Sequence, residues 1–171
     1  LSEGVRRAAT RVDLCHREPE YFELQDQVIQ GLLDVYQHDP ELWSAVLIGG
    51  SGTSAIEAMM ASLLPQDASL LVLENGVYGE RMSRIAGIYG IHNQALKAGW
   101  GDAIDLDALG ELLAPGDFTH VAAVHHETTT GRLNDLEAIG RACQAWGARL
   151  LIDAVSSFGA ERIAGRAWNV A

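Results

Sequence analysis

Lysine, cysteine and long apolar runs are all scarce in this chain of 171 residues. The only lysine is Lys97. The two cysteines, Cys15 and Cys143, are too few for a disulfide framework and fit a reducing compartment, so we expect a cytoplasmic protein. No apolar run is long enough to cross a bilayer, and the first residues lack the apolar stretch of a secretory signal. We therefore expect neither a membrane span nor an export signal.

Positive charge is scarce as well. The chain has 12 lysine and arginine residues against 23 acidic residues, for a formal net charge of −11. Because nucleic acids and anionic membrane surfaces repel such a chain, neither is an expected partner. The length suits one domain with a buried core better than two. The first residue is Leu1 rather than Met, so we expect the natural N-terminus to lie elsewhere.

Apolar segments of strand length alternate with helical periods, which predicts an α/β domain built on a parallel sheet. The expected strands are 45–48, 70–73, 91–96, 120–125 and 150–152. The expected helices are one opened by Pro19, one that follows Gly52 and stops at Pro65, one over 78–89, one capped by Asp105, and one capped by Asn134 with Glu137 as its reciprocal acid. Ligands bind beyond the carboxyl ends of strands in such sheets, so polar clusters at those ends are candidate sites.

The first candidate is the glycine-rich turn Gly50–Thr53, which joins an expected strand to an expected helix. Its glycines let the backbone approach an anion, and the free N–H groups and dipole of a helix N-terminus favour a phosphate. The hydroxyls of Ser51 and Thr53 could add hydrogen bonds. The alternative is a tight turn in which Ser or Thr caps the helix.

The second candidate is the segment 125–131, with three consecutive threonines whose hydroxyls could hold a ligand oxygen. A capped turn is the alternative. The neighbouring His120, His125, His126 and Glu127 suggest metal ligands. Strand alternation, however, places His125 on the face opposite to His120 and His126, and the spacing matches no ligand pattern, so we expect no metal.

The third candidate is Asp153, which follows a buried run and has no basic neighbour in sequence. A carboxylate there needs a donor or a cation, since otherwise its pKa rises, and the protonated ring nitrogen of a ligand would serve. Capping of a following turn, shared with Ser156, is the alternative. Tyr78 lies between glycines just past an expected strand, where its ring could cover a planar ligand or simply pack at a helix start.

Four segments occur in an order and spacing that resemble the class V pyridoxal-phosphate aminotransferases. They are 51–58 (SGTSAIEA), 75–82 (NGVYGERM), 126–131 (HETTTG) and 153–159 (DAVSSFG). The second of them and the triple threonine resemble most the branch that acts on 2-aminoethylphosphonate and pyruvate; the alanine–glyoxylate branch is more distant. The resemblance implies the large domain of fold type I, a mostly parallel sheet with helices on both faces, present here only in part.

The resemblance also implies a role for individual residues. Ser51, Gly52 and Thr53 would bind the phosphate of pyridoxal 5′-phosphate, and Tyr78 would stack on its ring. The remaining positions are Thr128 beside the phenolic oxygen, Asp153 on the pyridine nitrogen and Val155 under the ring. Asp153 would be the catalytic residue of the set. The implied reaction moves an amino group from 2-aminoethylphosphonate to pyruvate, giving phosphonoacetaldehyde and alanine, in a homodimer.

The chain also departs from the family pattern. Members of the family hold the coenzyme on a lysine that follows the aspartate strand, and no lysine follows Asp153 here. Lys97 belongs to a weak expected strand, where we expect it to be solvated. The sequence therefore predicts an N-terminal segment and helix over 1–40 and part of a coenzyme-binding domain over 41–171. We expect the complete protein to be an enzyme and these residues alone to be inactive.

Two other interpretations remain open. Gly50, Gly52 and Ala55 satisfy the dinucleotide-binding fingerprint, and Glu74 lies where a ribose-binding acid belongs, which predicts a nicotinamide-dependent oxidoreductase. That interpretation gives the threonines and Asp153 no role. The other is a non-catalytic domain that binds a partner or assembles, which the missing lysine favours.

Overall fold

The computed structural model describes all residues from 1 to 171, and the chain divides into two compact units, Leu1–Leu47 and Ile48–Ala171. The first unit contains helices α1 (Glu3–Ala8) and α2 (Pro19–Asp34). Pro19 occupies the first turn of α2, where its missing N–H costs no hydrogen bond, as the sequence predicts. Leu33 is the only buried residue of this unit. None of the chain's helices is both long and apolar enough to span a membrane.

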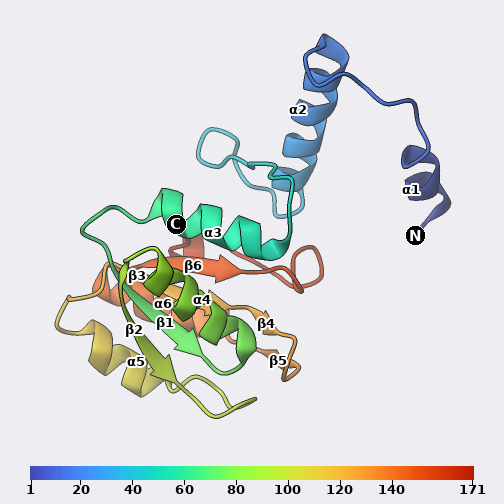
Figure 1. Ribbon diagram of the computed structural model, residues 1–171. Helices are drawn as coiled ribbons and strands as arrows, with labels where there is room; N and C mark the ends of the chain where they lie inside the picture. The colour runs from blue at the N-terminus through green and yellow to red at the C-terminus, as the bar shows by residue number, and fades with distance from the viewer. The chain divides into compact units, whose positions relative to one another are not determined.

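The second unit is built on a four-stranded parallel sheet in the order β2-β1-β3-β6 (Figure 1). Its strands are β1 (Ser69–Glu74), β2 (His92–Lys97), β3 (His120–Val124) and β6 (Arg149–Asp153). The helices are α3 (Gly52–Leu63), α4 (Val77–Ile88), α5 (Leu106–Leu113) and α6 (Leu136–Trp146), followed by the 3-10 turn η1 (Arg166–Trp168). A separate antiparallel pair, β4 (His126–Glu127) with β5 (Arg132–Leu133), follows β3.

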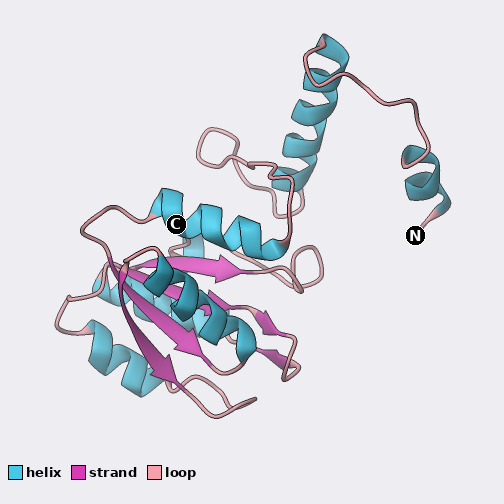
Figure 2. Ribbon diagram, viewed as in Figure 1, coloured by secondary structure: helices cyan, strands magenta, loops and turns pink.

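Helices cover both faces of this sheet (Figure 2), because successive residues of a buried strand point to opposite sides. On one side Leu71 and Leu73 pack in a cluster with residues of α5, α6 and η1. On the other side Leu70 and Val72 pack with residues of α3 and α4. Every residue of β1 and β3 is buried, which explains why these strands lack polar alternation in the sequence.

Most expected elements are present with small shifts at their ends, but the expected strand 45–48 is not. The segment forms no strand and belongs to no sheet, and the Val46 side chain is 79% exposed. An apolar run becomes a strand only when a partner satisfies its backbone groups, and no partner is available to this segment.

The predicted cap of α6 is also wrong. The N-cap is Asp135, whose side chain accepts a hydrogen bond from the N–H of Ala138. Asn134 is buried, and its amide exchanges hydrogen bonds with the amide of Asn75, at 2.8 and 3.3 Å. Glu137 pairs instead with Arg141, one turn along the helix. The expected cap of α5 by Asp105 is confirmed. Helix α6 ends at Gly147, whose φ of 75° suits glycine.

Candidate functional site

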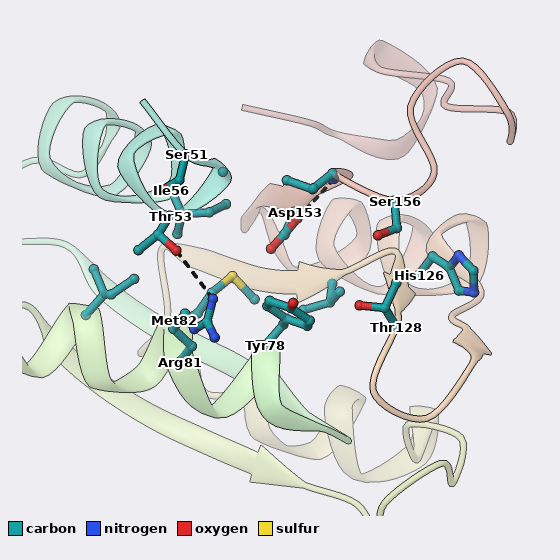
Figure 3. A pocket seen from close by; sticks show the side chains of 14 residues that line it. Ser51, Thr53, Ile56, Tyr78, Arg81, Met82, His126, Thr128, Asp153 and Ser156 are labelled. Atoms are coloured by element: carbon teal, nitrogen blue, oxygen red, sulfur yellow. Dashed lines mark hydrogen bonds between the residues drawn. The ribbon is translucent and has the colours of Figure 1, made fainter. Parts of the chain in front are cut away.

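A cavity of about 220 Å³ lies at the carboxyl ends of the central strands, where the topology of a parallel sheet predicts a ligand site. Figure 3 shows side chains from α3, α4, the segment after β4 and the end of β6 around this space. All seven residues that the family resemblance assigns to a coenzyme line it: Ser51, Gly52, Thr53, Tyr78, Thr128, Asp153 and Val155. Segments separated by up to about 100 residues therefore meet in one pocket.

The N-terminus of α3 forms one wall of the cavity. Ser51 is the N-cap residue, but its side chain makes no capping hydrogen bond, so the hydroxyl and the first N–H groups of the helix are available to an anion. A Cβ on Gly52 would lie 2.9 Å from a methyl carbon of Val155, closer than such atoms approach. The turn thus needs glycine there because the segment after β6 packs against it.

Helix α4 supplies Tyr78 and, one turn later, Arg81. The Arg81 guanidinium lies 4.6 Å from the centre of the Tyr78 ring and donates a 3.3 Å hydrogen bond to the Thr53 hydroxyl. A cation therefore lies beside the helix N-terminus that the sequence singled out for a phosphate. Arg81 was not predicted as a site residue from the sequence, although its spacing of three from Tyr78 places both on one face of a helix.

Asp153 ends β6 and is 8% exposed. Its carboxylate accepts a 3.1 Å hydrogen bond from the N–H of Val155, and it takes part in none of the chain's ion pairs. Burial raises the pKa of this carboxyl above its ordinary value. The Val155 N–H opposes that rise, the Glu127 charge adds to it, and Arg81 lowers it. The site thus holds an acid that lacks a cation of its own.

Glu127 is a second acid of the site that sequence analysis considered only as a metal ligand. It is fully buried, and one oxygen accepts hydrogen bonds from the N–H groups of Tyr78 at 3.0 Å and Gly79 at 3.3 Å. The other oxygen accepts from the N–H and the hydroxyl of Thr129, at 3.3 and 2.6 Å. Its spacing from Asp153 and Tyr78 in the sequence carries no signal of these contacts, because they depend on tertiary structure.

The histidines do not form a metal centre with Glu127. No three side chains of the usual ligand types come together anywhere in the chain. His125 is buried, burial lowers the pKa of its imidazole, and its Nδ1 atom has no hydrogen-bond partner. His126 lines the cavity, whereas His120 bonds to Thr119 at 2.8 Å.

The dinucleotide interpretation fails on two observations. The fingerprint requires a strand immediately before Gly50, and residues 45–48 form none. Glu74, the expected ribose-binding acid, is buried and accepts a hydrogen bond from the Ser83 hydroxyl, and its carboxylate lies 3.5 Å from the Lys97 ammonium. Lys97 is 75% exposed at its side chain, as expected, and does not line the cavity.

Comparison with known proteins identifies the class to which this fold and site belong. The fold is that of the fold type I aminotransferases: the alanine–glyoxylate aminotransferase from Nostoc sp. superposes with a TM-score of 0.87 at 32% identity, over 99% of this chain and 44% of that one. The family model of the class V aminotransferases matches residues 44–170. The chain belongs to the class V aminotransferase family.

Within this family, the chain is similar to proteins of one particular name. A 2-aminoethylphosphonate–pyruvate transaminase from Syntrophobacter fumaroxidans is 46% identical over 118 residues, which are 68% of this chain and 32% of that protein. The transaminase of the same name from Aeromonas hydrophila is 38% identical over 157 residues, which are 90% of this chain and 41% of that protein. The chain thus spans between about a third and two fifths of the length of these relatives.

Proposed function

We propose that the cavity binds pyridoxal 5′-phosphate and that the complete protein is a transaminase with 2-aminoethylphosphonate as amino donor and pyruvate as acceptor. The observation that carries the proposal is Asp153, a buried acid without a cation that faces a cavity opposite the free end of α3. Membership of the class V family supports the coenzyme. The names of the relatives support the two substrates.

The residues present fit the phosphate end of this coenzyme. The free N–H groups at the start of α3 and the hydroxyls of Ser51 and Thr53 would donate hydrogen bonds to phosphate oxygens. Arg81, held beside Thr53, would supply the positive charge that a dianion needs. Gly52 allows the close approach of the backbone.

The residues at the other end fit the ring. Tyr78 would stack on one face of the pyridine, Val155 would pack on it, and Thr128 would bond near the phenolic oxygen. Bound pyridoxal phosphate supplies an electron-accepting ring that stabilises negative charge on the amino donor. Asp153 would hold a proton on the ring nitrogen, and the ion pair would remove the cost of leaving this acid charged in a buried site.

The organisation of the complete protein forms part of the same proposal. Residues 41–171 would be part of its coenzyme-binding domain and 1–40 an N-terminal segment, in a cytoplasmic homodimer. Apolar side chains of the first unit such as Phe22, Val28 and Leu42 are 41–60% exposed, and contact with a second subunit would bury them. Residues 1–171 alone would not turn over, because their only lysine pairs with Glu74 outside the cavity.

The test uses the full-length protein. We expect it to bind pyridoxal phosphate with a visible absorbance band and to form alanine from 2-aminoethylphosphonate and pyruvate. Asp153→Asn should lower turnover about 10²- to 10³-fold, the range for losing one preorganised electrostatic contact, while the coenzyme still binds. Asp117→Asn, which changes an exposed acid outside the cavity, serves as the matched control. A protein that stays colourless with the coenzyme overturns the proposal. Activity with alanine and glyoxylate but not the phosphonate overturns the substrate assignment.

A further inference from the structure

Glu127 joins two segments of the cavity wall that are distant in sequence. One oxygen accepts hydrogen bonds from the N–H groups of Tyr78 and Gly79 in the first turn of α4. The other accepts from the N–H and the hydroxyl of Thr129, the neighbour of Thr128. The Thr129 hydroxyl in turn accepts a 3.3 Å hydrogen bond from the N–H of Val77. Helix α4 and the segment after β4 are thus connected through one carboxylate and one hydroxyl.

The packing around Glu127 leaves it little freedom. Its exposure is 0%, and a Cβ on Gly76 would lie 2.4 Å from its Cγ and 2.5 Å from its carboxyl carbon. The backbone before α4 therefore closes directly over the side chain. A carboxylate at a helix N-terminus also interacts favourably with the helix dipole, and four donors satisfy its oxygens. The packing holds the Glu127 side chain in place, and both of its oxygens are needed as acceptors to connect the two segments.

Glu127 bonds to the backbone N–H of Tyr78 and to Thr129, the neighbour of Thr128. Tyr78 and Thr128 are the two residues expected to contact a planar ligand. Tyr78 and Thr128 both line the cavity and are labelled in Figure 3. Glu127 itself does not line the cavity. It therefore acts on a ligand only through the residues that it holds, apart from the charge by which it raises the pKa of Asp153.

We propose that Glu127 is a positioning residue that sets the distance between the Tyr78 ring and the Thr128 hydroxyl, and thereby the orientation of the coenzyme ring. The inference rests on the proposed function. Replacement by Gln keeps the size of the side chain but exchanges one acceptor oxygen for an NH2 group, which cannot accept from the helix N–H groups or from Thr129. One of the two connections is then lost without a cavity being formed.

The experiment compares variants of the full-length protein by two measurements, the Kd for pyridoxal phosphate and the visible circular dichroism per bound coenzyme. Glu127→Gln should raise Kd about tenfold or more and reduce the dichroism, since a ring that is held loosely has a less defined orientation. Thr129→Val should act in the same direction, because it removes the hydroxyl from the other side of the connection, whereas Thr129→Ser should restore both values.

Glu80→Gln is the matched control. It removes the same charge from the first turn of α4, the turn to which Glu127 bonds, but Glu80 is exposed and bonds only to the Trp100 indole, at 3.4 Å. We expect its Kd and dichroism to equal those of the unchanged protein. If Glu127→Gln and Thr129→Val lower only the stability and leave both measurements unchanged, Glu127 is merely a helix cap and the inference is wrong. If the unchanged protein does not bind pyridoxal phosphate, the proposed function itself fails.

Discussion

Asp153 is a buried acid whose surroundings within the chain do not favour its charge. One backbone N–H is its only hydrogen-bond donor, the Glu127 charge repels it, and Arg81 acts on it without forming an ion pair. Such a group lowers the stability of the folded state unless a bound cation compensates for its burial. Sites of this kind are typical of functional positions, where stability is lower than packing alone would allow.

Asp153→Asn should therefore stabilise the protein in the absence of coenzyme. The pKa of Asp153 in the folded state is raised above its ordinary value of 3.8, so the folded state holds this proton more tightly than the unfolded state does. The stability that this proton contributes is fully present below pH 3.8 and is lost as the pH rises through the folded-state pKa. The Asn variant does not titrate, and its free energy of unfolding should exceed that of the unchanged protein at pH 7.

Urea unfolding at pH 7 and at lower pH values checks this expectation. The difference between the two proteins should shrink as the pH falls toward 3.8. The exposed Asp117→Asn should show no such pH-dependent gain. A variant that is less stable than the unchanged protein at pH 7 would contradict the assignment of Asp153 as an uncompensated acid.

Helix α6 shows how closely an element of this fold packs on its neighbours. A Cβ on Gly140 would lie 2.7 Å from the carbonyl oxygen and 2.8 Å from the Cα of Trp168. The backbone of η1 thus rests directly on the helix at this glycine. Gly110 in α5 offers a contrast, because a Cβ there would meet nothing within 4 Å. Both glycines lie inside helices, but only Gly110 has room for a larger side chain.

Gly140→Ala should lower the free energy of unfolding by about 1–3 kcal/mol, since backbone atoms of Trp168 must move to admit the methyl group. Gly110→Ala should instead raise it by about 0.5–1 kcal/mol, because alanine loses less backbone entropy in a helix. Denaturant unfolding of both variants measures the difference. Equal effects at the two positions would show that the contact with Trp168 does not govern packing here.

At the scale of the whole molecule, the two cysteines lie in different units of the chain and differ in their exposure to solvent. Cys15 is exposed in the first unit, whereas Cys143 is fully buried in the cluster between α6 and the sheet. Burial raises the pKa of the Cys143 thiol to about 12, so it carries almost no thiolate at neutral pH. Its reactivity therefore depends on opening of the core.

Under native conditions at pH 8, iodoacetamide should modify Cys15 and leave Cys143 unmodified. Both should react in 6–8 M urea, since unfolding exposes the Cys143 thiol and returns its pKa to the ordinary range. Peptide mapping by mass spectrometry distinguishes the two sites. Native modification of Cys143 at a rate close to that of Cys15 would mean that the second unit opens readily.

The sequence predicts most elements of this fold because hydrophobic periodicity reports burial directly. It predicts the apolar strand β1 and the helix α6, but it fails at 45–48, which pairs with no strand. The seven coenzyme contacts that the family resemblance implies all line one cavity, although the segment before Gly50 is not a strand. Glu127 was missed in this role because its hydrogen bonds to backbone N–H groups 48 and 49 residues away leave no local pattern. Arg81 was missed because its bond to the Thr53 hydroxyl joins two different helices.

The buried amides of Asn75 and Asn134 link the end of β1 to the start of α6. Each also bonds to a carbonyl, Asn75 to that of Asp102 and Asn134 to that of Val124. Exchanging one amide for an apolar side chain leaves the other without its partner in the buried interior, at a cost of about 1–3 kcal/mol. The two amides therefore form one buried polar unit, in which replacing either side chain costs the other a hydrogen-bond partner.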